Sequence, residues 1–130
     1  MSMAKEPWRL LVADDSLMTQ RILTQTAARY GFEVVGVASD GREAIQRWGE
    51  LRPDAVVLDI VMPEIDGIGV LEAILDQDRD ARVVMLSSLH TRKDVLECRS
   101  HGAKGYILKP FEPGHVFEIL RGLLETVRSD

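Results

Sequence analysis

The chain has 130 residues, a formal net charge of −5 at neutral pH and one cysteine, Cys98. This length suits one compact domain, the acidic balance disfavours nucleic-acid binding through phosphates, and a lone cysteine excludes an intrachain disulfide and agrees with a reducing, cytoplasmic setting. No apolar stretch approaches the roughly 20 residues that a membrane-spanning helix needs, so we predict a single domain over 1–130, without membrane insertion and with a flexible tail over 1–6.

The first half of the chain alternates apolar runs with helical patterns. Residues 8–13 have the length and composition of a buried strand, and apolar positions at helical spacing predict a helix over 17–30. A second apolar run predicts a strand over 32–38. The next helix is predicted over 40–51, because an aspartate and a glutamate three residues apart resemble a capping box at its start.

The middle of the chain holds the most informative stretch, AVVLD over 55–59. Its four apolar residues show no alternation, which is typical of a strand buried on both faces of a parallel sheet, and the run stops at Asp59. Proline and glycine within 63–67 then predict a loop. The remaining elements continue the alternation, with helices over 68–75, 93–100 and 113–127 and strands over 82–86 and 105–108.

Five strands that alternate with five helices predict an α/β domain with a parallel sheet and right-handed crossovers. In such a sheet the residues after the strands gather at one edge, where open α/β sheets bind their ligands. That edge receives Asp14, Asp15, Asp59, Ser87 and Lys109. The polar residues that follow the second strand, Ser39 and Asp40, are expected to add little if that strand is the outermost one.

Three carboxylates that lie close together repel one another, so we expect a cation among them. Oxygen ligands favour a hard divalent ion, for which Mg²⁺ is the usual choice. The metal and Lys109 would attract a phosphoryl group, which Ser87 could hydrogen-bond and a carboxylate could accept as an acyl phosphate. By the same repulsion, removing Asp14 or Asp15 is expected to stabilise the metal-free fold.

These strand-end residues, together with the motif MPEIDG over 62–67, resemble the receiver domains of bacterial two-component response regulators. The resemblance covers about residues 8–127, and each site residue stands at its expected strand end. It implies a three-layer, flavodoxin-like sandwich in which five helices cover a five-stranded parallel sheet of order 2-1-3-4-5. It also implies a stand-alone regulator of the chemotaxis type, without an attached output domain.

The resemblance assigns roles to the acidic residues. Asp59 would accept the phosphoryl group from the phosphohistidine of a sensor histidine kinase or a histidine phosphotransfer protein. Mg²⁺ would be held by Asp14 or Asp15 together with Asp59 and the main-chain carbonyl of Val61. Val61 and Leu89 are apolar at two positions that vary in the family, and they are expected to affect rates rather than the assignment.

The resemblance also assigns roles to residues of the last two strands. Ser87 and Lys109 would contact the phosphoryl group, and the Lys109–Pro110 peptide bond would be cis. Ser87 and Tyr106 would form the switch that reports phosphorylation to the surface of the fourth helix, the fifth strand and the fifth helix. The protein would catalyse only its own phosphorylation and dephosphorylation, and would be a monomer or a phosphorylation-dependent dimer with a downstream protein target still to be identified. A phosphate sink or relay intermediate without a direct target is the alternative.

Three other functions compete with this interpretation. A haloacid-dehalogenase-type phosphatase needs an acidic Asp two residues after the nucleophile, where this chain has Val61. A flavodoxin-type FMN carrier needs a loop rich in Ser, Thr and Gly after the first strand, where this chain has Asp14 and Asp15. A receiver-like scaffold that is never phosphorylated is disfavoured by the intact acceptor and lysine, and a phosphorylation assay is needed to decide.

Overall fold

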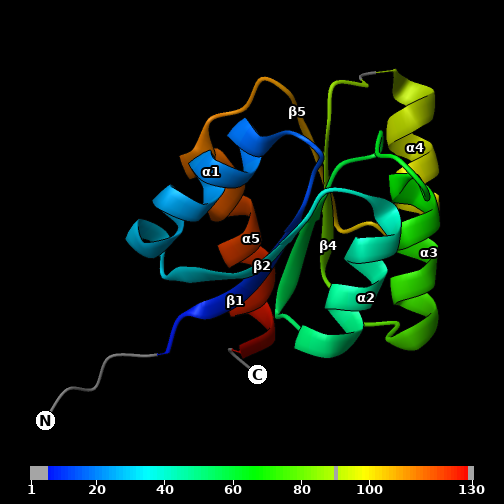
Figure 1. Ribbon diagram of the computed structural model, residues 1–130. Coiled ribbons are helices and arrows are strands. Elements are labelled where there is room, and N and C mark those ends of the chain that lie inside the picture. The colour runs from blue at the N-terminus through cyan, green and yellow to red at the C-terminus, as the bar shows by residue number, and fades with distance from the viewer. Residues whose placement is uncertain (1–5, 90, 129–130) are drawn as a thin grey trace, which may run out of the picture.

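The computed structural model describes residues 6–89 and 91–128, so most of the predicted tail lies outside the described residues. Strands and helices alternate along them (Figure 1). The strands are β1 (Trp8–Ala13), β2 (Phe32–Ala38), β3 (Ala55–Leu58), β4 (Val83–Ser87) and β5 (Gly105–Leu108). The helices are α1 (Leu17–Thr26), the 3₁₀ turn η1 (Ala27–Tyr30), α2 (Gly41–Leu51), α3 (Gly67–Gln77), α4 (Arg92–Ser100) and α5 (Pro113–Arg128).

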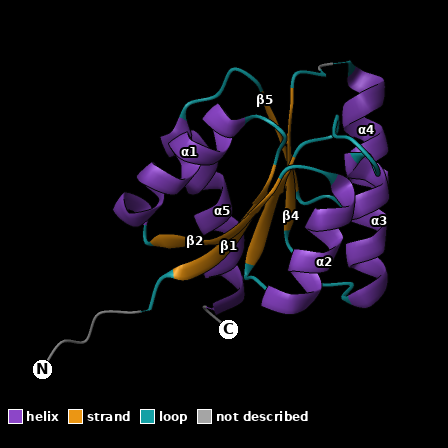
Figure 2. Ribbon diagram, in the orientation of Figure 1, coloured by secondary structure: helices purple, strands orange, loops and turns teal. Residues whose placement is uncertain are grey.

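The strands form one parallel sheet in the order β2-β1-β3-β4-β5, which confirms the predicted class and strand order. Figure 2 shows α1 and α5 on one side of the sheet and α2, α3 and α4 on the other. Each side has its own apolar core, with Leu23 and Phe117 buried in one and Trp48 and Ile74 in the other. The molecule is therefore the three-layer sandwich that the resemblance implies. Over the described residues, none of the helices combines the length and the apolar character needed to cross a bilayer.

The central position of β3 explains its unbroken apolar sequence. The strand lies between β1 and β4, and its residues are at most 1% exposed. Val56 packs into the core beneath α2 and α3, and the next residue, Val57, packs into the core beneath α1 and α5. Because both faces are covered, the strand needs apolar residues at successive positions. Its C-terminal end brings Asp59 to the middle of the sheet edge.

Several element boundaries shift by one or two residues, and two boundaries and one cap differ in ways that the hydrogen bonds explain. The predicted helix over 17–30 tightens into η1 for its last turn, as helix ends often do. Strand β4 extends to Ser87, because the Ser87 carbonyl accepts a hydrogen bond from the Lys109 amide at 2.9 Å. At the start of α2, Asp40 accepts from the Glu43 amide, but the Glu43 carboxylate accepts from the Ser39 amide instead of completing a capping box.

Candidate functional site

The site lies at the edge where the parallel strands end. Asp14 directly follows β1 and Asp59 directly follows β3, and the Asp59 amide donates to the Ala13 carbonyl at 2.8 Å. One carboxylate oxygen from each of Asp14, Asp15 and Asp59 lies within 4.8 Å of the others. Asp14 and Asp59 are buried, whereas Asp15 is exposed. The fold thus brings together the three carboxylates that the sequence placed at one edge.

Lys109 supplies a cation to this acidic group. Its Nζ lies 2.7 Å from Asp14 Oδ2 and 3.3 Å from Asp59 Oδ2. Sequence reasoning placed Lys109 beside an incoming phosphoryl group, but it did not foresee this double ion pair with the carboxylates themselves. The ammonium offsets part of the repulsion that led us to expect a metal, and its side chain remains 22% exposed.

The donor set fits a hard divalent cation. Asp14 Oδ1 accepts from the Ser16 amide at 2.8 Å and Asp59 Oδ1 accepts from the Val61 amide at 3.2 Å, which orients both carboxylates. Asp14 Oδ2 is fully buried and receives no hydrogen bond of normal geometry, although it is paired with Lys109. A buried anionic oxygen without a hydrogen bond, next to two other carboxylates, suits a Mg²⁺ site with water on its exposed side. The predicted main-chain ligand, the Val61 carbonyl, stays a prediction.

The pKa values of Asp59 and Lys109 are both raised, for different reasons. Burial raises the pKa of the Asp59 carboxyl, the nearby Asp14 carboxylate raises it further, and Lys109 only partly opposes both. Burial lowers the pKa of Lys109, but its contacts with Asp14 and Asp59 outweigh burial, so that the pKa is raised. Lys109 therefore stays charged, while the ionised form of Asp59 is held at a cost to the metal-free fold.

We predict that Asp59→Asn stabilises the metal-free protein at neutral pH and that the gain shrinks in acid. A carboxyl whose pKa is raised by folding loses stability as the pH rises from its unfolded pKa through its folded pKa. The amide imitates the protonated acid, so the two proteins should converge as the pH falls into the ordinary carboxyl range. Melting temperatures in EDTA across this pH range test the prediction, with the exposed Asp80→Asn as control. A gain that is constant with pH would contradict it.

Two glycines allow the loop after β3 to pack closely. A Cβ on Gly67 would lie 2.1 Å from the Asp59 carbonyl oxygen, and a Cβ on Gly41 would lie 1.9 Å from the Ile65 carbonyl oxygen. In the same places the Gly67 amide donates to the Ile60 carbonyl at 2.7 Å and the Gly41 amide to the Pro63 carbonyl at 3.1 Å. Larger side chains would push the loop away from the sheet edge. The loop that carries Asp59 is thus held in place by contacts with the first residue of α3 and with the first residue of α2.

A short hydrogen-bond chain leads from β4 to β5. The Leu89 amide donates to Ser87 Oγ at 3.1 Å, and the Tyr106 hydroxyl donates to the Leu89 carbonyl at 2.5 Å. Burial raises the pKa of the Tyr106 hydroxyl, which therefore stays protonated at neutral pH. The peptide bond between Lys109 and Pro110 is cis. The two predicted switch residues are therefore linked through the backbone of Leu89.

One residue that sequence reasoning missed lies against the acidic group. Gln20 is 8% exposed on α1, and its Nε2 donates to the Asp14 carbonyl at 2.7 Å and to Ser39 Oγ at 3.0 Å. The only signal in the sequence was its position three residues before the buried Leu23, on the inner face of the helix. Ser39, which we expected to add little, is thereby connected to the site.

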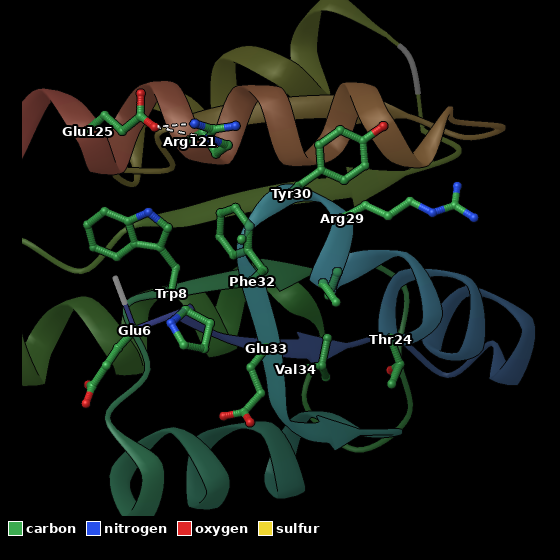
Figure 3. A pocket seen from close by; sticks show the side chains of 14 residues that line it. Glu6, Trp8, Thr24, Arg29, Tyr30, Phe32, Glu33, Val34, Arg121 and Glu125 are labelled. Carbon is green, nitrogen blue, oxygen red and sulfur yellow. Dashed lines mark hydrogen bonds and ion pairs between the residues drawn. The ribbon is translucent and has the colours of Figure 1, made fainter. Parts of the chain in front are cut away.

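A large groove lies away from the site, at the end where the strands begin. It holds about 1030 Å³ between η1, the start of β2 and α5, and its walls include Trp8, Tyr30 and Phe32 (Figure 3). Tyr30 and Phe32 also pack on Phe117, with ring centroids 5.4 and 5.1 Å apart. Its aromatic walls thus belong to the core, and the groove contributes nothing to the acidic group.

We predict that Asp15→Ala raises the melting temperature of the metal-free protein and removes most of the stabilisation by Mg²⁺. Asp15 is exposed, and Ser16, not Asp15, caps α1, so the substitution removes a repelling charge without removing a cap. The structure changes our expectation for Asp14→Ala, which should lower stability because Lys109 and the Ser16 amide lose their partner. Thermal melts in EDTA and in Mg²⁺ test this, and a lower melting temperature for Asp15→Ala in EDTA would contradict it.

Comparisons with a family profile, with protein sequences and with solved structures all match this chain to receiver domains. The response regulator receiver domain profile matches residues 10–121. The chemotaxis protein CheY of Thermotoga maritima is 38% identical over 112 residues, which are 86% of this chain and 93% of that protein. The protein-glutamate methylesterase/protein-glutamine glutaminase 5 of Myxococcus xanthus is 47% identical over 127 residues, but these are 36% of its length. A chain in the CheX–CheY–BeF₃–Mg²⁺ complex of Borrelia burgdorferi has a TM-score of 0.86 and 37% identity, over 90% of this chain and 89% of that one.

Proposed function

The chain belongs to the response regulator receiver domain family and is a CheY-type receiver of two-component signalling, and we propose that Asp59 is the residue that is phosphorylated. The observation that carries the proposal is the position of Asp59 at the end of the central strand, 3.3 Å from Lys109 Nζ and beside Asp14 and Asp15. Membership of this family supports the receiver interpretation over the dehalogenase and flavodoxin interpretations.

The proposed reaction is transfer of a phosphoryl group from a phosphohistidine to the Asp59 carboxylate. A carboxylate oxygen attacks phosphorus, the P–N bond breaks, and the imidazole that leaves takes up a proton. The protein positions its groups and neutralises charge, which is most of what phosphoryl transfer requires. Lys109, which lies 3.3 Å from Asp59 Oδ2, would contact the incoming oxygens, and Ser87, whose Oγ accepts from the Leu89 amide, would hydrogen-bond one of them. Mg²⁺, when bound by Asp14, Asp15, Asp59 and the Val61 carbonyl, would neutralise further charge on the phosphoryl oxygens.

The phosphodonor is proposed to dock on apolar side chains that surround this edge. Four large apolar residues near the site are between 48% and 72% exposed, and they come from three segments: Leu17, Met18, Val61 and Leu108. They lie at the start of α1, in the loop after Asp59 and at the end of β5. Apolar groups with this exposure suit contact with another protein. We propose that a histidine kinase or a histidine phosphotransfer protein in the cytoplasm covers them during transfer.

The output is proposed to use the connection from Ser87 through Leu89 to Tyr106. A phosphoryl group bound by Ser87 would disturb the Ser87–Leu89 hydrogen bond and so the Leu89 carbonyl that Tyr106 contacts. Tyr106 would then report the change to the surface of α4, β5 and α5, where a protein target would bind. The protein would act without other catalysis, as a monomer or a phosphorylation-dependent dimer. A sink or relay role without a direct target remains the second candidate.

Labelling of the purified protein tests the proposal. Incubation with acetyl phosphate and Mg²⁺ should add one phosphoryl group, seen by intact mass, and EDTA should prevent the addition. Absence of labelling under conditions that label another receiver would instead support an unphosphorylated scaffold.

A pull-down with and without beryllofluoride then separates a regulator with a direct target from a phosphate sink or relay, because only a regulator with a direct target should capture a partner in its activated form.

A further inference from the structure

We infer that Gln20 is a positioning residue for the acidic group, acting through the main chain of Asp14; this inference rests on the proposed function. Its Nε2 donates to two acceptors, the Asp14 carbonyl at 2.7 Å and Ser39 Oγ at 3.0 Å. These acceptors belong to the ends of β1 and β2. Gln20 is 8% exposed, so water does not readily replace either hydrogen bond.

The contacts of Asp14 show what the Gln20 hydrogen bond adds. The Asp14 amide donates to the Ala38 carbonyl at 2.9 Å, and Asp14 Oδ1 accepts from the Ser16 amide at 2.8 Å. The Gln20 contact fixes the remaining main-chain group of Asp14, its carbonyl. Because the peptide unit is planar, holding this carbonyl also sets the direction in which the chain enters Asp15. Asp15 is exposed, and its side chain makes no hydrogen bond or ion pair with the rest of the described chain. The orientation of Asp15 therefore depends on this peptide.

The turn between β2 and α2 links the same hydrogen bonds to the loop that follows Asp59. Ser39 accepts from Gln20, and its own amide donates to the Glu43 carboxylate at 3.1 Å. Two residues later, the Gly41 amide donates to the Pro63 carbonyl at 3.1 Å. This turn thus contacts the segments that carry the acidic residues on both sides of the site. Gln20 is the side chain that connects it to the Asp14–Asp15 segment.

Positioning of this kind has a measurable signature in metal selectivity. Mg²⁺ requires nearly ideal octahedral geometry with short bonds, whereas Ca²⁺ tolerates irregular ligand positions. Loss of Gln20 leaves the charge of the site unchanged and changes only how well its ligands are placed. Mg²⁺ affinity should therefore fall more than Ca²⁺ affinity. If Gln20 contributed only to fold stability, its loss would leave the ratio of the Mg²⁺ affinity to the Ca²⁺ affinity unchanged.

The test is isothermal titration of the full chain with MgCl₂ and with CaCl₂. Gln20→Met keeps the length and burial of the side chain but removes both N–H donors. We expect its Mg²⁺ dissociation constant to rise about tenfold, with a rise for Ca²⁺ of about threefold or less. Ser39→Ala, at an exposed position that should not affect folding, should weaken Mg²⁺ binding in the same direction. It should have no further effect when combined with Gln20→Met, because Ser39 acts through Gln20.

Thr19→Val is the matched control, since Thr19 is similarly buried on the same helix and its side chain takes no part in these hydrogen bonds. Unchanged Mg²⁺ affinity in Gln20→Met would overturn the inference, as would an equal loss for Mg²⁺ and Ca²⁺ or an equal loss in Thr19→Val. If Gln20→Met does not fold, unchanged Mg²⁺ affinity in Ser39→Ala overturns the inference on its own. If the wild-type protein does not bind Mg²⁺, the proposed metal site itself is wrong, and this inference is wrong with it. If the wild type binds Mg²⁺ and Gln20→Met binds it equally well, only this inference is wrong.

Discussion

Asp59→Asn should abolish labelling by acetyl phosphate, with a loss beyond the detection limit of intact mass measurement. The amide has no anionic oxygen to attack phosphorus, and the other two carboxylates of the site are placed differently. Asp14 Oδ2 is fully buried against Lys109, and Asp15 is exposed and forms no ion pair with Lys109 within the described residues. Asp59 Oδ2 lies 3.3 Å from Lys109 Nζ, and the Asp59 side chain stays 7% exposed whereas that of Asp14 is fully buried.

The structure makes this result interpretable, because the same substitution is expected to stabilise the metal-free fold. Loss of labelling could not then be attributed to unfolding, because melting curves of the same samples would show that Asp59→Asn is folded. Glu64→Gln serves as the control, since Glu64 is an exposed acid in the same loop. Labelling of Asp59→Asn to the wild-type level would show that another residue accepts the phosphoryl group.

The fold class and the acidic group were predictable because the alternation of strands and helices and the burial of the strands are recorded in local sequence, whereas the strand order came from the resemblance to receiver domains. The unbroken apolar run of β3 indicated a strand covered on both faces, and the parallel class then required its final residue, Asp59, to meet Asp14 at one edge. Pro63, Asp66 and Gly67 marked the loop after β3, but only the structure shows how close Gly67 comes to the Asp59 carbonyl.

What escaped prediction depends on distances between segments far apart in the chain. Nothing in the sequence indicates that Lys109 would reach Asp14 at 2.7 Å, because Lys109 is equally consistent with a contact to a phosphoryl group and Asp14 with a contact to a metal ion. Gln20 reads as an ordinary polar helix residue, and its role arises only because α1 packs over the ends of β1 and β2. Different degrees of burial likewise separate Asp14 from Asp15, two adjacent residues of the same type.

The phosphorylated form is expected to be long-lived, and Val61→Asn with Leu89→Glu should speed its hydrolysis about tenfold or more. Hydrolysis requires a water that attacks phosphorus in line with the Asp59–phosphorus bond, which breaks to give inorganic phosphate and the free carboxylate. The resemblance to receiver domains implies that the side chains at positions 61 and 89 would orient that water. Valine and leucine have no group that can hydrogen-bond to it.

The structure separates the contributions of the two positions. Val61 is 57% exposed, so Val61→Asn should alter hydrolysis with little change in stability. Leu89 is partly buried and packs against the core beneath α4, so Leu89→Glu should also lower stability. Packing alone would predict that Leu89→Glu loses stability without faster hydrolysis. Single variants therefore show which effect each residue contributes.

The measurement follows loss of the acyl phosphate after labelling is stopped by removal of the donor, with Mg²⁺ present throughout. The wild type, each single variant and the double variant are compared at a temperature well below all their melting points. Leu96→Asn is a suitable control, because Leu96 is also an exposed apolar residue, 49% accessible, but lies on α4 and outside the site. The apolar pair would not determine the lifetime if the double variant and the wild type decayed at the same rate, or if Leu96→Asn accelerated decay equally.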